Sequence, residues 1–252
     1  RAAWLGFMFG MGLFGAGASW VYVSIHEFGF MPAPMAAFFV LLFVAYLSLF
    51  PALAGWLQAR LLNPGYTRLL FAAPVAWVLA EWLRGWLLTG FPWLHLGYSQ
   101  SDSVLMNIAP LMGVYGMSLL VAILAALLAV IIQAHGRTRV LTLVSFTVLL
   151  LGSWLSGQLE FARPDGERIR LALVQGNVPL HEKWKQGASQ KIIQHYLALS
   201  RTAVDKAEVI IWPEGAVPST WQRASFLVEP ALPRRSDMTI PEYMIGTIDA
   251  PP

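Results

Sequence analysis

The chain begins with five long apolar stretches separated by short polar segments. They run from Trp4 to Ile25, Ala33 to Leu57, Leu69 to Leu88, Leu111 to Gln133, and Val140 to Ser156. A helix of about 20 apolar residues is long enough to cross a hydrocarbon core of ~30 Å. The pattern therefore predicts a polytopic transmembrane domain of about five helices over residues 1–156.

The pattern changes after residue 156, where polar residues become frequent. Residues 157–168 include the turn sequence Arg163-Pro164-Asp165-Gly166, which is typical of a linker. Beyond it, strands are expected at Ile169 to Val174, Glu208 to Trp212 and Tyr243 to Ile248, and a helix at Ser189 to Lys206. Residues 169–252 are therefore predicted to form an α/β domain, as an open sheet or a sandwich.

The composition supports a membrane protein with a polar C-terminal part. Hydrophobic residues make up 57% of the chain and charged residues 12%. Of 17 Lys and Arg and 14 Asp and Glu, residues 1–156 hold only six and three. No basic tract accompanies aromatic residues, which argues against a nucleic-acid partner. Cysteine is absent, the histidines have no metal-ligand spacing, and no metal or cofactor is expected.

Loop charges predict the orientation in the membrane, because Lys and Arg accumulate on the cytoplasmic side. Basic side chains occupy the second and fourth loops, at Arg60, Arg68, His135, Arg137 and Arg139. The other two loops hold Glu27 and Asp102 and no Lys or Arg. Five crossings that start inside then place the α/β domain outside the cytoplasm.

Glu214 is the leading candidate for chemistry. It follows the apolar run Ile210-Ile211-Trp212-Pro213, and the end of a strand is a frequent position for functional side chains in α/β proteins. A general base needs a raised pKa and a shielded position, and Trp212 beside it is expected to help provide both. The alternative for an isolated strand is a carboxylate that caps the next turn.

The membrane domain carries a second group of candidates. Glu81 and Arg84 are three residues apart on one predicted helix and are placed to pair. Charges inside a membrane are costly and are functional candidates by default. Arg84 and the loop that carries Trp93 are candidates to hold a lipid headgroup, and a structural ion pair is the alternative. Gly6 and Gly10 form a small-xxx-small pair that predicts close helix packing.

Several motifs resemble known families. One group of motifs resembles the first half of a nitrilase-type domain. Its members are Leu173-Val174-Gln175-Gly176-Asn177-Val178-Pro179, Lys183-Trp184, Ile210-Ile211-Trp212-Pro213-Glu214-Gly215-Ala216-Val217-Pro218 and Ile245-Gly246-Thr247. A second group, in the membrane part, resembles the apolipoprotein N-acyltransferase family. Its members are Trp20-Val21-Tyr22-Val23-Ser24-Ile25, Glu81-Trp82-Leu83-Arg84-Gly85-Trp86, Thr89-Gly90-Phe91-Pro92-Trp93 and Gly97-Tyr98-Ser99-Gln100. The resemblance implies a bacterial inner-membrane protein whose nitrilase-like α/β sandwich lies on the periplasmic side.

The resemblance also implies a mechanism. Enzymes of this class use a Glu, Lys and Cys triad, and Glu214 matches the general base. The acyl donor is a membrane phospholipid, typically phosphatidylethanolamine, and the acceptor is the N-terminal amine of a diacylated apolipoprotein cysteine. A thioester on the enzyme links the two half-reactions. Trp184 matches a tryptophan that this family places near its active site, although packing is an equal alternative.

The end of the chain departs from the family pattern. No Cys is present, and Lys183, Lys185, Lys191 and Lys206 all precede Glu214 and do not match the family's lysine. The sequence is therefore expected to be a fragment, truncated at both ends and inactive alone. Two further hypotheses stay open: a membrane-tethered amidase or nitrilase acting on small amides, and an inactive protein that binds lipid or lipoprotein.

Overall fold

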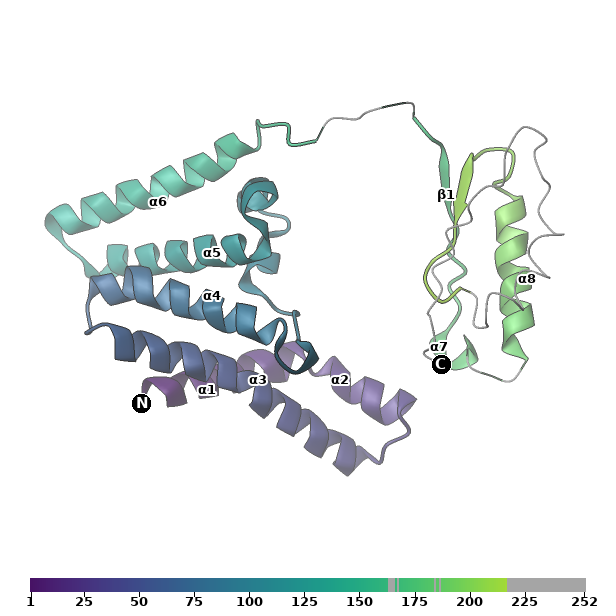
Figure 1. Cartoon of the computed structure of the whole chain (residues 1–252), viewed down its shortest axis with the longest axis horizontal. Coiled ribbons are helices and arrows are strands. Elements are labelled where there is room, and N and C mark those ends of the chain that lie inside the picture. The colour runs from purple at the N-terminus through teal and green to yellow at the C-terminus, as the bar shows by residue number, and fades with distance from the viewer. Residues whose placement is uncertain (163–165, 167, 184, 186, 217–252) are drawn as a thin grey trace. The chain divides into compact units, whose positions relative to one another are not determined.

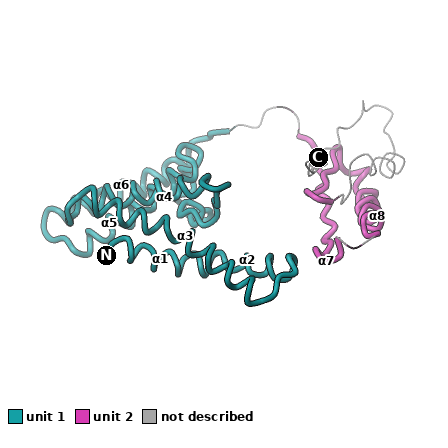
Figure 2. Tube along the Cα trace, turned by 60° about the horizontal axis from the view of Figure 1, so that its bottom comes forward, with its two compact units in different colours: residues 1–163 teal, residues 164–252 magenta. Residues whose placement is uncertain are grey.

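The computed structural model of the chain describes residues 1–162, 166, 168–183, 185 and 187–216. The chain divides into two compact units, Arg1–Arg163 and Pro164–Pro252 (Figure 2). The division falls within the predicted linker at residues 157–168. Outside the described residues lie the predicted strand at Tyr243 to Ile248, the candidate Trp184, and the predicted linker turn Arg163-Pro164-Asp165-Gly166 except for Gly166.

The first unit is helical, as its apolar sequence predicts (Figure 1). Its longer helices are α1 (Ala2–Gly17), α3 (Ala33–Leu61), α4 (Ala73–Arg84), α5 (Ala109–Gln133) and α6 (Gly136–Ser156). Two short helical segments, α2 (Trp20–Val23) and η1 (Ser24–Phe28), lie between α1 and α3. The remaining short segments are η2 (Arg68–Ala72), η3 (Leu87–Thr89), η4 (Leu96–Gln100) and η5 (Val104–Ile108). Large apolar side chains such as Trp4, Phe39 and Ile132 are exposed, as expected for helices that face lipid.

Several of these helices have the length and composition to cross a membrane. Within the described residues there are three such spans: Ala33–Leu61, Val104–Gln133 and Gly136–Ser156. A fourth is present if Ala2–Gly17 and Trp20–Phe28, which are bent by 53° relative to each other, count as one span. The predicted stretch from Leu69 to Leu88 is helical over η2 and α4 but is shorter than the others. Five crossings therefore remain a prediction.

Close packing joins α1 to α3, and small residues permit it. A Cβ at Gly10 would lie 2.8 Å from Ser48 Cα, and a Cβ at Gly6 would overlap the carbonyl of Pro51. From the opposite side, a Cβ at Gly55 would lie 2.6 Å from the carbonyl oxygen of Ala2. The prediction that Gly6 and Gly10 serve helix packing is confirmed.

The core between α1, α3 and α4 surrounds the second group of candidates. Ala76 and Ala80 of α4 are buried against Phe14 of α1 and Leu47 of α3. The small alanine side chains let α4 approach its neighbours closely. On this inner face of the last turn of α4, Glu81 and Arg84 are buried, whereas Trp82 of the same turn is exposed.

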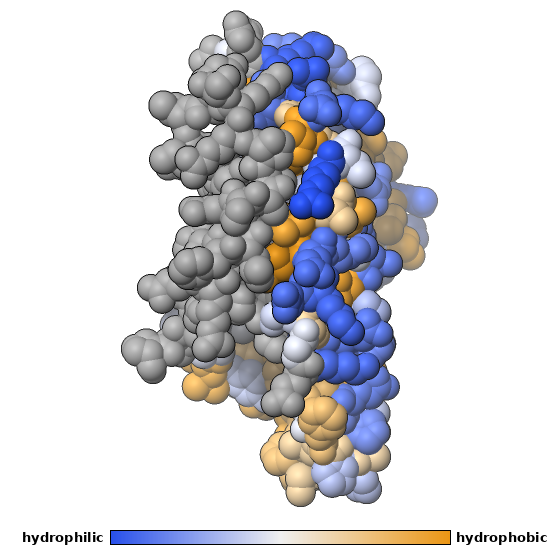
Figure 3. All heavy atoms as spheres, turned by 90° about the vertical axis from the view of Figure 1, so that its right-hand side faces the viewer, coloured by the Kyte–Doolittle hydropathy of each residue, from blue (hydrophilic) through white to orange (hydrophobic). Residues whose placement is uncertain are grey.

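The second unit contains a parallel β–α–β arrangement. Strands β1 (Leu171–Leu173) and β2 (Val209–Ile211) pair in parallel, with Ala172 opposite Ile210. The short helix α7 (Leu180–Lys183) and the longer α8 (Ala188–Arg201) connect them. The predicted strand–helix–strand order is confirmed, and the complete nitrilase-like sandwich remains a prediction. The face in Figure 3 is largely hydrophilic over the described part of this unit.

Helix α8 presents one apolar face to the small sheet. Ile192, Ile193, Tyr196 and Leu197 are buried there, together with Trp212 from the end of β2. The predicted helix end at Lys206 is wrong, because α8 ends at Arg201. The amides of Thr202, Ala203 and Lys206 donate to carbonyls three residues earlier, and these tight turns lead the chain out of the helix toward β2.

Candidate functional site

Glu214 lies on a tight turn after β2. The amide of Ala216 donates a hydrogen bond to the carbonyl of Pro213 over 3.1 Å, which closes a four-residue turn around Glu214 and Gly215. Gly215 has a φ of +67°, as the third position of a type II turn requires. Glycine adopts this conformation without the steric cost that a Cβ brings. The turn therefore places Glu214 at its outer corner.

Buried residues on both sides fix this turn. Trp212 is 7% exposed and its Nε1 donates to Ser200 Oγ over 2.8 Å, while its ring lies 5.3 Å from that of Tyr196 on α8. On the other side, Ala216 belongs to the same core. Glu214 itself is exposed. The described residues thus position the carboxylate but do not shield it as expected, because Trp212 turns into the core.

The loop after β1 lies at the same edge of the sheet. The two strands are parallel, so their carboxyl ends meet at this edge. The amide of Val174 donates to the carbonyl of Ile211 over 2.9 Å and continues the pairing beyond β1. His195 of α8 donates from Nε2 to the carbonyl of Gly176 over 3.0 Å. His195 had no predicted role, and it ties this loop to α8.

Lys183 brings an ammonium group to the Glu214 turn. The amides of Glu182 and Lys183 both donate to the carbonyl of Pro179, which fixes α7 after the β1 loop. The side chain of Lys183 is half-buried and ends against Gly215, where a Cβ would overlap Nζ. The sequence alone gives no sign of this contact, because only folding brings Lys183 beside Gly215.

In the first unit, Arg84 holds the loop that follows α4. Its guanidinium donates to the carbonyls of Phe91 over 2.7 Å, of Trp93, and of Leu94 over 3.4 Å. Its own carbonyl accepts from the amide of Phe91 over 2.8 Å, and its Cζ lies 5.1 Å from the ring centroid of Phe14. The planar group presents several donors at fixed angles, which suits it to bind adjacent carbonyls. Arg84 thus fixes the loop that carries the exposed Trp93.

Glu81 fixes the same loop from the other side. Its Oε1 accepts from Trp77 Nε1 over 3.0 Å and from the amide of Leu96 over 2.7 Å. Glu81 and Arg84 do not form the direct ion pair that their spacing suggested, because each side chain is committed to other partners. Their charges still interact through space, since both residues are 3% exposed in the same buried region.

His95 is a buried residue in this loop that the sequence analysis missed. It is 3% exposed, and its ring stacks on that of Tyr98 at 5.8 Å and lies 5.2 Å from that of Tyr115. Burial lowers the pKa of His95 below its ordinary value, and the positive charge of Arg84 lowers this pKa further. A single histidine in a loop carries no sequence signal for such burial.

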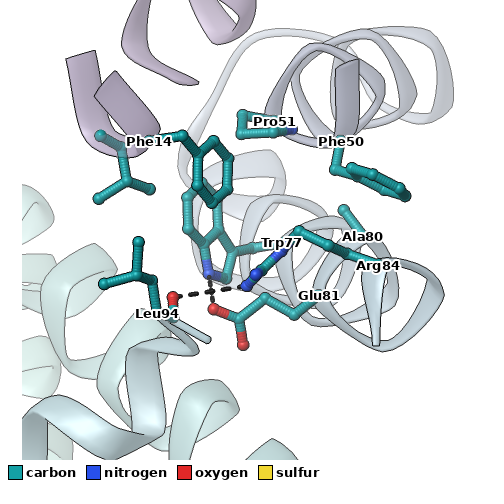
Figure 4. A pocket seen from close by; sticks show the side chains of 9 residues that line it. Phe14, Phe50, Pro51, Trp77, Ala80, Glu81, Arg84 and Leu94 are labelled. Atoms are coloured by element: carbon teal, nitrogen blue, oxygen red, sulfur yellow. Dashed lines mark hydrogen bonds between the residues drawn. The ribbon is translucent and has the colours of Figure 1, made fainter. Parts of the chain in front are cut away.

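A small hollow lies beside these residues. Phe14 from α1 and Phe50 and Pro51 from α3 provide apolar walls, and Glu81 and Arg84 provide its polar part (Figure 4). Within the described ranges, no group of His, Asp and Glu is arranged to hold a metal ion. The first unit thus offers a hydrogen-bonded loop with exposed aromatic side chains, and the second offers a carboxylate and an ammonium at the carboxyl edge of two parallel strands.

Comparisons with known proteins connect both units to one family. A family model described as "Apolipoprotein N-acyltransferase N-terminal domain" matches residues 1–127. The apolipoprotein N-acyltransferase of Methylococcus capsulatus is 45% identical over 226 residues, which cover 89% of this chain and 45% of the relative. Those of Nitrosomonas europaea and Vibrio cholerae are 40% and 42% identical, over 95% and 90% of this chain and 49% and 45% of the relatives. The chain spans about half the length of the curated relatives it matches.

Proposed function

The chain belongs to the apolipoprotein N-acyltransferase family, and we propose that it acts in moving a fatty acyl chain from a membrane phospholipid to the N-terminal amine of a diacylated lipoprotein cysteine. The observation that carries the proposal is Glu214 on its fixed turn, in a chain 45% identical to such an enzyme. The relatives reported above share this name, which gives no support to a hydrolase of small amides.

In the proposed mechanism, Glu214 is the general base. It takes the proton of a cysteine thiol, and the thiolate attacks the ester carbonyl of the phospholipid. The lyso-lipid alkoxide leaves and regains a proton from Glu214, which leaves a thioester. The lipoprotein amine then attacks the thioester, gives a proton to Glu214, and the thiolate leaves. These 252 residues contain no cysteine, so the thiol must come from outside them.

The membrane unit is proposed to supply the lipid. Arg84 and Glu81 are committed to the loop between α4 and α5, so their contribution is to hold its shape. That shape keeps Trp93 exposed, next to Trp20 with ring centroids 6.2 Å apart. Tryptophan favours the boundary between headgroups and acyl chains, so Trp93 is proposed to contact the incoming lipid. We propose the periplasmic side of the inner membrane for the second unit.

Mass spectrometry of the intact full-length protein after exposure to phosphatidylethanolamine tests this function. The wild type is expected to gain the mass of one acyl chain, and Glu214→Gln is expected to gain it at least about a hundredfold more slowly, since general-base catalysis contributes about 10² to 10⁴ in rate. Glu182→Gln, at another exposed carboxylate near the site, is the control and is expected to acylate normally. Normal acylation of Glu214→Gln would refute the assigned role.

A further inference from the structure

Lys183 is the ionisable group nearest the Glu214 turn that the proposed mechanism leaves unused. We infer that Lys183 binds the phosphate group of the phospholipid donor and so places its ester beside Glu214, an inference that rests on the function proposed above. This assigns the headgroup to a residue of the second unit and not to the loop held by Arg84.

The position of Lys183 carries the argument. Its side chain runs half-buried from α7 to Gly215, the residue directly after Glu214. The ion pairs found in the described part of this unit are Arg170 with Glu208 at 3.2 Å and His181 with Glu182 at 3.9 Å. Lys183 takes part in neither. Its ammonium lies beside Gly215, and no ion pair among the described residues engages it, so its charge is available to an anion.

Gly215 makes this arrangement possible in two ways. Its φ of +67° shapes the turn that carries Glu214, and the missing Cβ leaves the space that Lys183 Nζ occupies. Any other residue at position 215 would both strain the turn and displace the ammonium. The carboxylate and the ammonium are thus positioned by one local structure at the carboxyl edge of β1 and β2.

Phosphate is the anion that fits this position. A lysine ammonium has three donors and no acceptor, and it binds phosphate as a compact positive charge. In a glycerophospholipid, only the glycerol unit separates the phosphate from the ester carbonyls. A phosphate on Lys183 therefore brings an ester to the neighbourhood of Glu214, where the mechanism requires it. The carboxylate of a fatty acid would instead place the anion at the reacting carbon itself.

Lysine labelling tests binding without requiring catalysis. The intact full-length protein is treated with a limiting amount of a lysine acetylating reagent, and peptide mass spectrometry gives the labelling rate of each lysine. Glycerophosphoethanolamine is expected to slow labelling of Lys183 about fivefold and to leave exposed Lys185 and Lys191 unchanged. Ethanolamine, which lacks phosphate, is expected to have no effect. Unchanged labelling of Lys183, or equal protection of all three lysines, would overturn the inference.

A parallel arm with inorganic phosphate distinguishes a lipid headgroup from free phosphate. The two compounds are compared at the same concentration. If glycerophosphoethanolamine protects Lys183 from labelling at least as well as inorganic phosphate does, the result supports headgroup binding. Protection by inorganic phosphate alone would show an anion site that does not accept the lipid, and would overturn the assignment to the donor.

Kinetics of acyl-enzyme formation provide the second test. Lys183→Gln is expected to raise the KM for phosphatidylethanolamine about tenfold, as loss of one charge-assisted hydrogen bond predicts, and to leave kcat within about twofold. Lys183→Arg is expected to restore most of the affinity, and Lys185→Gln is the matched control. A fall in kcat at constant KM would refute a headgroup role. If the wild type forms no acyl-enzyme, the proposed function fails, and labelling still decides the role of Lys183.

Discussion

Replacement of Arg84 by methionine is expected to release the loop between α4 and α5. The change removes the guanidinium donors to the carbonyls of Phe91, Trp93 and Leu94, and leaves Glu81 as a buried carboxylate without a nearby positive charge. A hydrogen bond from a charged donor is worth about 1.5–3 kcal/mol, but three bonds from one group do not add fully. Removing one partner of a buried charge arrangement costs about 3–5 kcal/mol. We therefore expect a loss of about 3–5 kcal/mol in local stability.

Amide hydrogen exchange of the intact full-length protein in detergent measures this loss where it occurs. The amides of Phe91 and Leu96 are both bonded to the last turn of α4, over 2.8 and 2.7 Å. A local loss of ~3 kcal/mol corresponds to about a hundredfold faster exchange at these amides. Arg84→Lys keeps the charge but loses the planar fork, so an intermediate effect is expected. Arg60→Gln, at an exposed arginine near the end of α3, is the control.

The double variant Glu81→Gln, Arg84→Met tests the electrostatic part of the reasoning. Because it removes the stranded carboxylate charge, it is expected to exchange more slowly at Phe91 than Arg84→Met alone. If the amides of Arg84→Met exchange at rates within about threefold of the wild-type rates, the guanidinium does not hold the loop. If the single and double variants have equal amide exchange rates, Arg84 does not act by compensating the charge of Glu81.

Two further predictions follow from the packing of the first unit. Gly10→Val is expected to destabilise the protein by about 1–3 kcal/mol in thermal unfolding, because its side chain would overlap Ser48. Gly12→Ala, where nothing lies within 4 Å, is expected to be neutral, and equal effects of the two would contradict the packing argument. Burial and Arg84 lower the pKa of His95, so the unfolded state binds its proton first. The contribution of His95 to the stability of the folded state is therefore complete above about pH 6.5 and falls as the pH decreases below that value. The thermal stability of His95→Gln is expected to depend less on pH than that of the wild type. An equal pH dependence in both proteins would contradict this origin.

The elements that the sequence predicted correctly are those with a local signal. The long apolar stretches predicted helices in the first unit, and Gly6 and Gly10 predicted where two of them pack closely. Alternation and helical spacing predicted the order β1, α8 and β2. Such patterns depend on neighbours a few residues apart, so they are visible before folding. The helix end at Lys206 was wrong because the turns after Arg201 follow from the path to β2.

The candidate side chains were found more easily than their partners. Glu214, Glu81 and Arg84 stand out in the sequence because of their residue type and position. Their spacing suggested that Glu81 and Arg84 pair, whereas the fold gives them the amide of Leu96 and the carbonyl of Phe91. Residue spacing along a helix shows which side chains share a face, but it does not show what a loop offers them.

The sequence by itself determined an apolar helical unit, a β–α–β unit, membership of the apolipoprotein N-acyltransferase family and a carboxylate at the end of β2. The tertiary structure alone decided that Arg84 holds a loop, that His95 is buried and that Lys183 reaches the turn of Glu214. The physical reason is the range of the interactions. Periodicity, turn chemistry and residue type act over a few residues, whereas burial and hydrogen bonds between distant segments exist only once the chain has folded.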